Sequence, residues 1–182
     1  MKRLALRLFA LLVTVMLGLT AAATPSVASP ASERCSAEVD TSSNYQYRCE
    51  FGIFPLADIP AGGAVKNGVF QLAVTHFSDY FPFSGCGDVL KVNQTCALMP
   101  GNAPVQVTEI GSNYYILKSL KGHPEGENRY IKFAVYIIDN ELRLGILSWG
   151  EPSVVAKATV SFGGATALWG GYARNLTKTV YP

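Results

Sequence analysis

The sequence predicts an all-β domain, an antiparallel β-sandwich or β-barrel of about eight or nine strands with two disulfides. The first reason is composition, because only 15% of the residues are charged and many of the others suit strands and turns. The second is the repeated alternation of apolar and polar residues between turn-forming residues. The third is an even number of cysteines, four in all, which small secreted domains commonly pair into disulfides.

The first residues have the features of a secretory signal peptide. Three basic residues precede an apolar run over residues 8–19, which is too short to span a bilayer comfortably. Alanines at 21–23 then suit cleavage by a signal peptidase. We therefore expect a leader over residues 1–23, with cleavage as late as residue 28, and a single secreted domain over residues 29–182.

The charge of the expected mature chain differs from that of the full chain. The full chain has 15 Lys and Arg against 13 Asp and Glu, a formal net charge of +2. All charges in the leader are basic, so without the leader the acidic residues outnumber the basic ones by one. No long basic run remains, which argues against nucleic acid as a partner. The residues before Cys35 lack the small apolar pattern of a lipoprotein, so we expect no stable membrane anchor.

The cysteines are predicted to pair as Cys35–Cys49 and Cys86–Cys96. The first pair brackets a hairpin whose turn falls at residues 41–43. Zinc binding by the four thiolates is disfavoured, because the sequence lacks a C-x-x-C motif and an exported chain meets oxidising conditions. The pairs expected across this hairpin are Cys35 with Cys49, Ala37 with Tyr47, and Val39 with Tyr45.

Between the first hairpin and the middle of the chain the pattern is less regular. Residues 51–68 hold several prolines and glycines and are predicted to form a surface loop. Residues 69–77 have apolar side chains at alternate positions and are predicted to form a half-buried strand. Residues 78–104 form the longest irregular stretch, which we expect to be a loop fastened by the second disulfide.

Two antiparallel pairs are predicted next. Residues 105–110 and 114–120 form one hairpin around a turn at 111–113. Residues 129–150 form a long two-stranded ribbon that turns at Asp139-Asn140, because both residues tolerate a left-handed backbone. One face of the ribbon is then wholly apolar, and a slip of one residue would lose that division, so the register is specified. The pairs on the apolar face are Phe133 with Ile146, Val135 with Leu144, and Ile137 with Leu142.

The last part of the chain is also predicted to form strands. Residues 153–162 alternate, and Gly163-Gly164 suits a tight turn that leads back along residues 165–169. A tail over residues 172–182 would add a final strand. No stretch after the leader is predicted to be a helix.

Aromatic residues in the long loop form the first candidate binding site. Tyr80, Phe81 and Phe83 lie close together just before Cys86. A loop that a disulfide and a proline stiffen loses less conformational entropy when it binds a partner. The alternative is that these rings cover one end of the core.

Aromatic residues on the ribbon form the second candidate site. Tyr130, Tyr136 and Trp149 fall on the mixed face, beside Lys132 and Arg143. Flat aromatic rings with polar neighbours suit sugar stacking or a protein interface. The alternative is that a second sheet covers this face.

No motif in the sequence identifies a catalytic site. The nucleophile elbow, the Walker loop, the dinucleotide fingerprint and the zinc-protease motif are all missing from it. The two histidines, His76 and His123, lie in separate segments. Residues 123–127 offer three possible metal ligands, but a proline and a glycine there favour a solvated turn. Catalytic residues therefore stay unknown, and we assign no metal and no cofactor.

The expected function is that of a secreted, non-catalytic protein that binds an extracellular partner. The partner would be a carbohydrate, or a protein such as an enzyme that this chain inhibits. The alternative is a small secreted hydrolase whose site the spacing of residues does not reveal. Asn93 and Asn175 begin glycosylation sequons, which matter only where secreted proteins are glycosylated.

Overall fold

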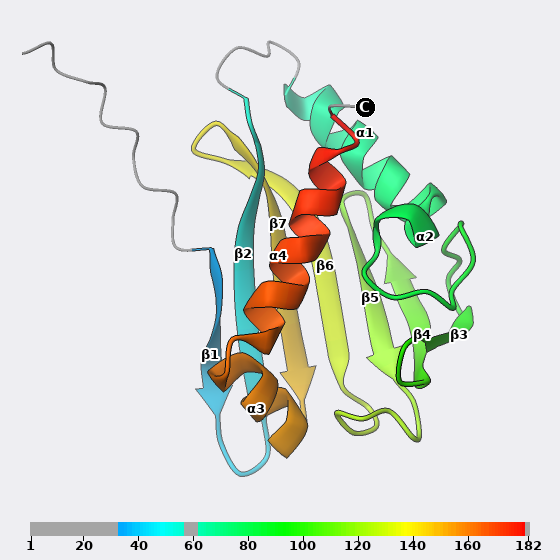
Figure 1. Cartoon of the computed structure of the whole chain (residues 1–182), viewed down its shortest axis with the longest axis vertical. Coiled ribbons are helices and arrows are strands. Elements are labelled where there is room, and N and C mark those ends of the chain that lie inside the picture. Colours follow the sequence, from blue (N-terminus) through cyan, green and yellow to red (C-terminus); the bar gives the residue numbers. More distant parts are fainter. Residues whose placement is uncertain (1–32, 57–61, 181–182) are drawn as a thin grey trace, which may run out of the picture.

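The computed structural model describes residues 33–56 and 62–180, which form one open antiparallel sheet with helices on one face (Figure 1). The strand order is β1-β2-β7-β6-β5-β4-β3. The strands are β1 (Arg34–Asp40), β2 (Tyr45–Pro55), β3 (Thr95–Leu98), β4 (Ala103–Ile110), β5 (Tyr114–Ser119), β6 (Tyr130–Ile138) and β7 (Glu141–Gly150). The helices are α1 (Gly62–Thr75), α2 (Phe77–Tyr80), α3 (Val154–Ser161) and α4 (Gly164–Thr177).

The predicted fold class is therefore correct only in its coarser part. The described residues are mostly β, their strands are antiparallel, and two disulfides are present. They form a single open sheet where a sandwich or barrel was predicted, and helices cover its inner face instead of a second sheet (Figure 1). The predicted signal peptide lies outside the described residues.

The ribbon of β6 and β7 has the predicted register over its whole length. The pairs run from Tyr130 opposite Trp149 to Ile138 opposite Glu141. Asp139 has φ 48° in the turn, a left-handed value that aspartate and asparagine accept more readily than most residues. The apolar face of the ribbon is buried and faces the helices, except at Ile137 beside the turn, which is 39% exposed. The predicted hairpin that precedes it is also confirmed, as β4 and β5.

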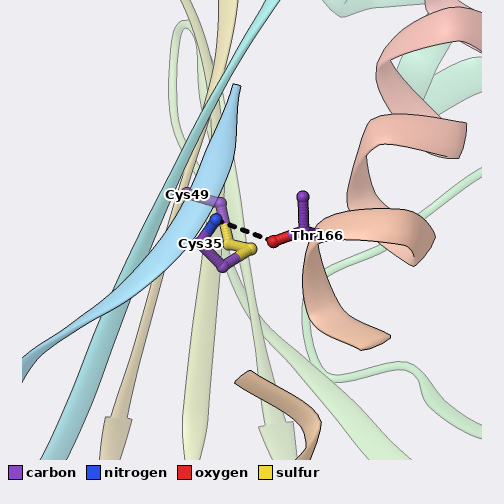
Figure 2. Close-up of a disulfide and its surroundings, with 3 residues drawn as sticks. All are labelled: Cys35, Cys49 and Thr166. Atoms are coloured by element: carbon purple, nitrogen blue, oxygen red, sulfur yellow. Dashed lines mark hydrogen bonds between the residues drawn. A yellow bond between two sulfur atoms is a disulfide. The ribbon is translucent and has the colours of Figure 1, made fainter. Parts of the chain in front are cut away.

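Both predicted disulfides are confirmed, and the first ties the edge strand to the rest of the fold. Cys35 on β1 lies opposite Cys49 on β2 and is bonded to it. Figure 2 shows that the backbone N–H of Cys35 also donates to Oγ1 of Thr166 on α4, at 3.0 Å. A bulge after Ala37 moves the partner of Val39 from the predicted Tyr45 to Gln46. The second disulfide, Cys86–Cys96, joins the long loop to β3.

Strand β2 joins the first hairpin to the long ribbon of β6 and β7. It pairs with β1 on one side and with β7 on the other, from Tyr45 opposite Gly150 to Pro55 opposite Glu141. The first part of the predicted surface loop over 51–68 is thus strand. Its last part belongs to helix α1.

Helix α1 occupies most of the segment that was predicted to be a strand over 69–77. Its buried residues are Val69, Phe70, Ala73 and Val74, and this spacing follows the helical period. Phe70 and Val74 belong both to this set and to the alternating set of a strand, so the pattern alone was ambiguous over so short a stretch. Burial against the sheet decides in favour of the helix.

Helices α3 and α4 occupy the residues predicted to form the last strands. Ser153 caps α3, because its Oγ accepts the N–H of Ala156 at 3.2 Å. Gly163 has φ 77° and joins two helices, not two strands as predicted. The predicted tail strand is also wrong, since α4 continues through its first residues to Thr177. The side chains that α4 buries are Ala165, Trp169, Tyr172, Ala173 and Leu176.

Helix α4 lies against the inner face of the sheet and closes the core (Figure 1). At Gly170 a Cβ would come within 3.3 Å of the ring of Phe51 on β2, so the glycine permits a close approach. The hydroxyls of Tyr115 on β5 and Tyr172 on α4 are 3.0 Å apart and fully buried. None of the described helices is long and apolar enough to cross a membrane.

Candidate functional site

A cavity of about 270 Å³ lies between the inner face of the sheet and helices α3 and α4. Most of its walls are apolar side chains that come from segments far apart in the sequence. Strands β2, β5 and β6, the long loop before β3, and both helices contribute. The aromatic side chains among the lining residues include Tyr47, Phe81, Phe83, Phe133 and Trp169.

The aromatic rings form a preformed wall. The centroid of Phe81 lies 4.3 Å from that of Phe77, with the rings stacked, and 5.5 Å from that of Phe133, edge to face. Trp169 of α4 meets Phe133 edge to face at 5.1 Å. Rings that pack against several neighbours in different directions have little freedom to turn. This side of the cavity therefore keeps its shape without a ligand.

One end of the cavity is polar, and Arg129 is at its centre. This side chain is only 3% exposed. Its backbone N–H donates to Oγ of Ser119 at 2.8 Å, and its Nη1 donates to the carbonyl of Glu151. Its Nη2 makes two longer contacts, 3.4 Å to the carbonyl of Tyr45 and 3.5 Å to Oγ of Ser148. Two main-chain carbonyls and two serine hydroxyls thus hold the arginine in place.

Glu125 and His123 complete the polar end from the loop between β5 and β6. Oε2 of Glu125 lies 3.9 Å from Nε of Arg129. Burial raises the pKa of the Glu125 carboxyl, an effect that the arginine partly offsets. Burial and the charge of Arg129 lower the pKa of His123, whose Nδ1 accepts the backbone N–H of Glu125 at 3.1 Å. Low solvation therefore shifts the pKa values of the two groups in opposite directions, upward for the carboxyl and downward for the imidazole.

The first predicted binding site, in the long loop, borders this cavity. Phe81 is 5% exposed and Phe83 packs partly against the core, and both line the cavity. The carbonyl of Tyr80 accepts the side-chain amide of Asn175 at 3.0 Å. The rings of Phe81 and Phe83 thus face inward, as the core-covering alternative required. A role for these three residues in binding stays a prediction, and among them only Phe81 and Phe83 line the cavity.

The second predicted site lies on the outer face of the sheet, which no second sheet covers among the described residues. The rings of Tyr130 and Trp149 stack on each other, 5.4 Å apart and 10° from parallel, and Lys118 lies over Tyr130. Tyr136 lies across Gly145, where a Cβ would come within 2.6 Å of its ring. The ring faces that would stack on a sugar are thus partly occupied by neighbouring side chains.

The other candidates from the sequence do not meet at the cavity. His76 is exposed and its Nδ1 lies 3.0 Å from Oγ1 of the adjacent Thr75, whereas His123 lines the cavity. Among the described residues, no group of three His, Cys, Asp or Glu side chains could hold a metal ion. Of the sequon asparagines, Asn93 is exposed in a turn and Asn175 is half-buried on α4.

Sequence reasoning missed Arg129 and Trp169 as site residues. Arg129 stands where the ribbon begins, and Trp169 was placed on a strand that is in fact α4. The sequence does hold one indication of Trp169. If α4 is read as a helix, Trp169, Tyr172 and Leu176 fall on a single face, which predicts that this face is buried. Nothing in the spacing of Arg129 from the other polar residues points to a shared site.

Comparisons with known proteins identify the fold and not a family. No family model and no curated protein matches the sequence. The structure is similar to that of a protein from Rhodobacter sphaeroides, with 11% identity and a TM-score of 0.51 over 81% of this chain and 98% of that one. It is also similar to the allergen Ara h 8.0201, with 9% identity and a TM-score of 0.53 over 76% and 99%. A protein from Mesorhizobium loti gives 10% identity and a TM-score of 0.51 over 75% and 96%. At these identities the likeness concerns the fold alone.

Proposed function

We propose that this chain is a secreted, non-catalytic binding protein that holds a small, largely apolar molecule in the cavity beneath α4. The supporting observation is the cavity itself, about 270 Å³ in volume and walled mostly by apolar and aromatic side chains. Concave apolar sites with a few polar groups are typical of small-molecule binding. Burial of apolar surface would supply the affinity, at about 25 cal/mol per Å² before the costs of association.

This ligand class differs from the carbohydrate or protein partner that the sequence suggested. A sugar inside the cavity would leave most of its hydroxyls facing apolar rings, which costs free energy for each unpaired group. A protein partner would need a projecting surface, whereas Phe81 and Phe83 face inward. The expected leader and the two disulfides support an extracellular setting for the same activity.

The hydrolase alternative receives less support from the same site. It would need a nucleophile beside the histidine that lines the cavity. Nδ1 of His123 accepts the backbone N–H of Glu125. Among the hydrogen bonds of the described residues, none joins the His123 ring to a serine or threonine hydroxyl. Ser119 and Ser148 instead bond to Arg129.

The neutral fluorescent probe N-phenyl-1-naphthylamine should bind the purified protein saturably, with one probe per chain. Replacing Leu168 with tryptophan should weaken this binding by about tenfold or more, because Leu168 lines the cavity from α4 and a larger side chain would fill it. Fluorescence titration measures both. Leu147→Trp is the matched control, since the same change there lies on the outer face of the sheet.

If the Leu168→Trp and Leu147→Trp proteins bind the probe with equal affinity, the probe binds elsewhere on the surface and not in the cavity. Complete lack of saturable binding by the wild-type chain would contradict the proposed function. Thermal melting of each variant separates a filled cavity from a damaged fold, because a folded variant keeps a cooperative transition.

A further inference from the structure

The guanidinium of Arg129 is buried at the cavity with one donor that lacks a hydrogen-bond partner. Its Nε–H is shielded from solvent and makes no hydrogen bond. An unpaired charged donor in such a setting is costly. Replacing a buried charged group with well-packed apolar side chains is often neutral or stabilising, so stability alone does not explain this arginine. An unsatisfied buried donor beside a cavity is therefore a sign of a ligand group that would pair with it.

The unpaired donor lies on the edge of the guanidinium that binds carboxylates best. Nε and Nη2 of an arginine point the same way and can hold both oxygens of one carboxylate. In Arg129, Nη1 is committed to the carbonyl of Glu151. Its Nη2 has only the long contacts of 3.4 and 3.5 Å, and its Nε makes no hydrogen bond. The Nε–Nη2 edge, which would receive an anion, thus makes the weakest contacts of this side chain.

Glu125 covers this edge without bonding to it. Its Oε2 lies 3.9 Å from Nε, beyond hydrogen-bond distance. The Glu125 side chain is 25% exposed, so it can turn toward solvent without unfolding the loop. The loop itself is held by main-chain bonds, including the N–H of Gly126 to the carbonyl of His123 at 2.9 Å. The carboxylate of Glu125 therefore occupies the anion position loosely.

We propose that the ligand of this cavity is an amphipathic carboxylic acid whose carboxylate replaces that of Glu125 on the Nε–Nη2 edge of Arg129. Its apolar body would lie among Phe81, Phe133 and Trp169. The inference rests on the proposed function and narrows it to one chemical class. An acid gains a charge-assisted pair in a poorly solvated place, where such a pair is strong. A neutral molecule of the same shape leaves the donor unpaired.

Displacement of bound N-phenyl-1-naphthylamine by decanoate and by 1-decanol tests the inference, because the two molecules share a tail and differ in the head. The wild-type chain should prefer the acid by about tenfold or more. Glu125→Gln should tighten decanoate by about a further tenfold, since it removes the competing anion and keeps the shape, and should leave 1-decanol unchanged. Glu127→Gln, an exposed carboxylate of the same loop, is the matched control and should change neither.

Arg129→Gln should remove the preference for the acid, while its thermal transition shows whether the chain still folds. If the arginine variant does not fold, the pair of glutamate variants still decides the matter. If decanoate and 1-decanol displace the bound probe equally in the wild-type and Glu125→Gln proteins, the inference is overturned. The same holds if neither molecule displaces the probe. Both results leave the proposed function standing, because the neutral probe still binds. Failure of the neutral probe and of 1-decanol to bind would instead overturn the proposed function.

Discussion

Replacing Phe133 with alanine should lower the free energy of unfolding by about 3–5 kcal/mol, the usual range for deleting a large buried aromatic side chain. Phe133 is 1% exposed. Its ring lies 5.0 Å from that of Tyr115 in the sheet and 5.1 Å from that of Trp169 on α4. One truncation therefore removes contacts within the sheet and between the sheet and its covering helix. Denaturation with urea, followed by circular dichroism, measures the loss.

Lys132→Ala is the control for this experiment, because Lys132 is the neighbour of Phe133 on the outer face. Its Nζ lies 3.8 Å from the centroid of the Tyr114 ring, a surface contact worth about 0.5–1 kcal/mol. We expect this variant to lose no more than that. Equal losses for the two variants would mean that the faces of the ribbon are assigned the wrong way round.

Raising the pH above about 10 should destabilise the folded chain steeply. Burial raises the pKa of Tyr47, Tyr115 and Tyr172 well above the ordinary value for tyrosine. In the unfolded chain these phenols ionise near pH 10. Above that pH the folded state holds protons that the unfolded state has released, so the free energy of unfolding falls as pH rises. Each tyrosine contributes about 1.4 kcal/mol per pH unit, or about 4 kcal/mol for the three.

Urea titrations at about pH 9 and about pH 11 measure this dependence. Tyr47→Phe removes one of these phenols and keeps the ring, so the slope should become shallower by about 1.4 kcal/mol per pH unit. Trp149→Phe, on the outer face, is the control, because it changes an aromatic ring without removing a phenol and should keep the wild-type slope. A wild-type chain whose stability stays level between the two pH values would contradict the burial of these tyrosines.

The sequence predicted the sheet well where side chains alternate and turn residues stand between strands. The ribbon is the best case, because Asp139-Asn140 marks its turn and a shifted register would expose its apolar face. The first hairpin was predicted from cysteine spacing, apart from one bulge that no residue signals. These features are local, or depend on pairs close in the sequence.

The helices could not be read in the same way, because their residues favour strands when considered alone. Helix α1 begins with two glycines and contains valines, and α3 begins with two valines, residues that a strand accommodates well. The sheet beneath buries one helical face of α1, whereas α3 buries only Ala156 and begins at the Ser153 cap. The cavity has no sequence signature either, since Phe81, Arg129 and Trp169 meet only after the helices have packed.

The pairing of β2 with β7 also determines how this chain must fold. Residues 45–55 pair with residues 141–150, so this pairing joins two strands that lie far apart in the sequence. Closing so large a loop costs entropy before any contact repays it, and chains with such high contact order fold slowly. The hairpin of β1 and β2 is local and can form early. The other edge of β2 then has unpaired backbone N–H and C=O groups until β7 has been synthesised and pairs with it.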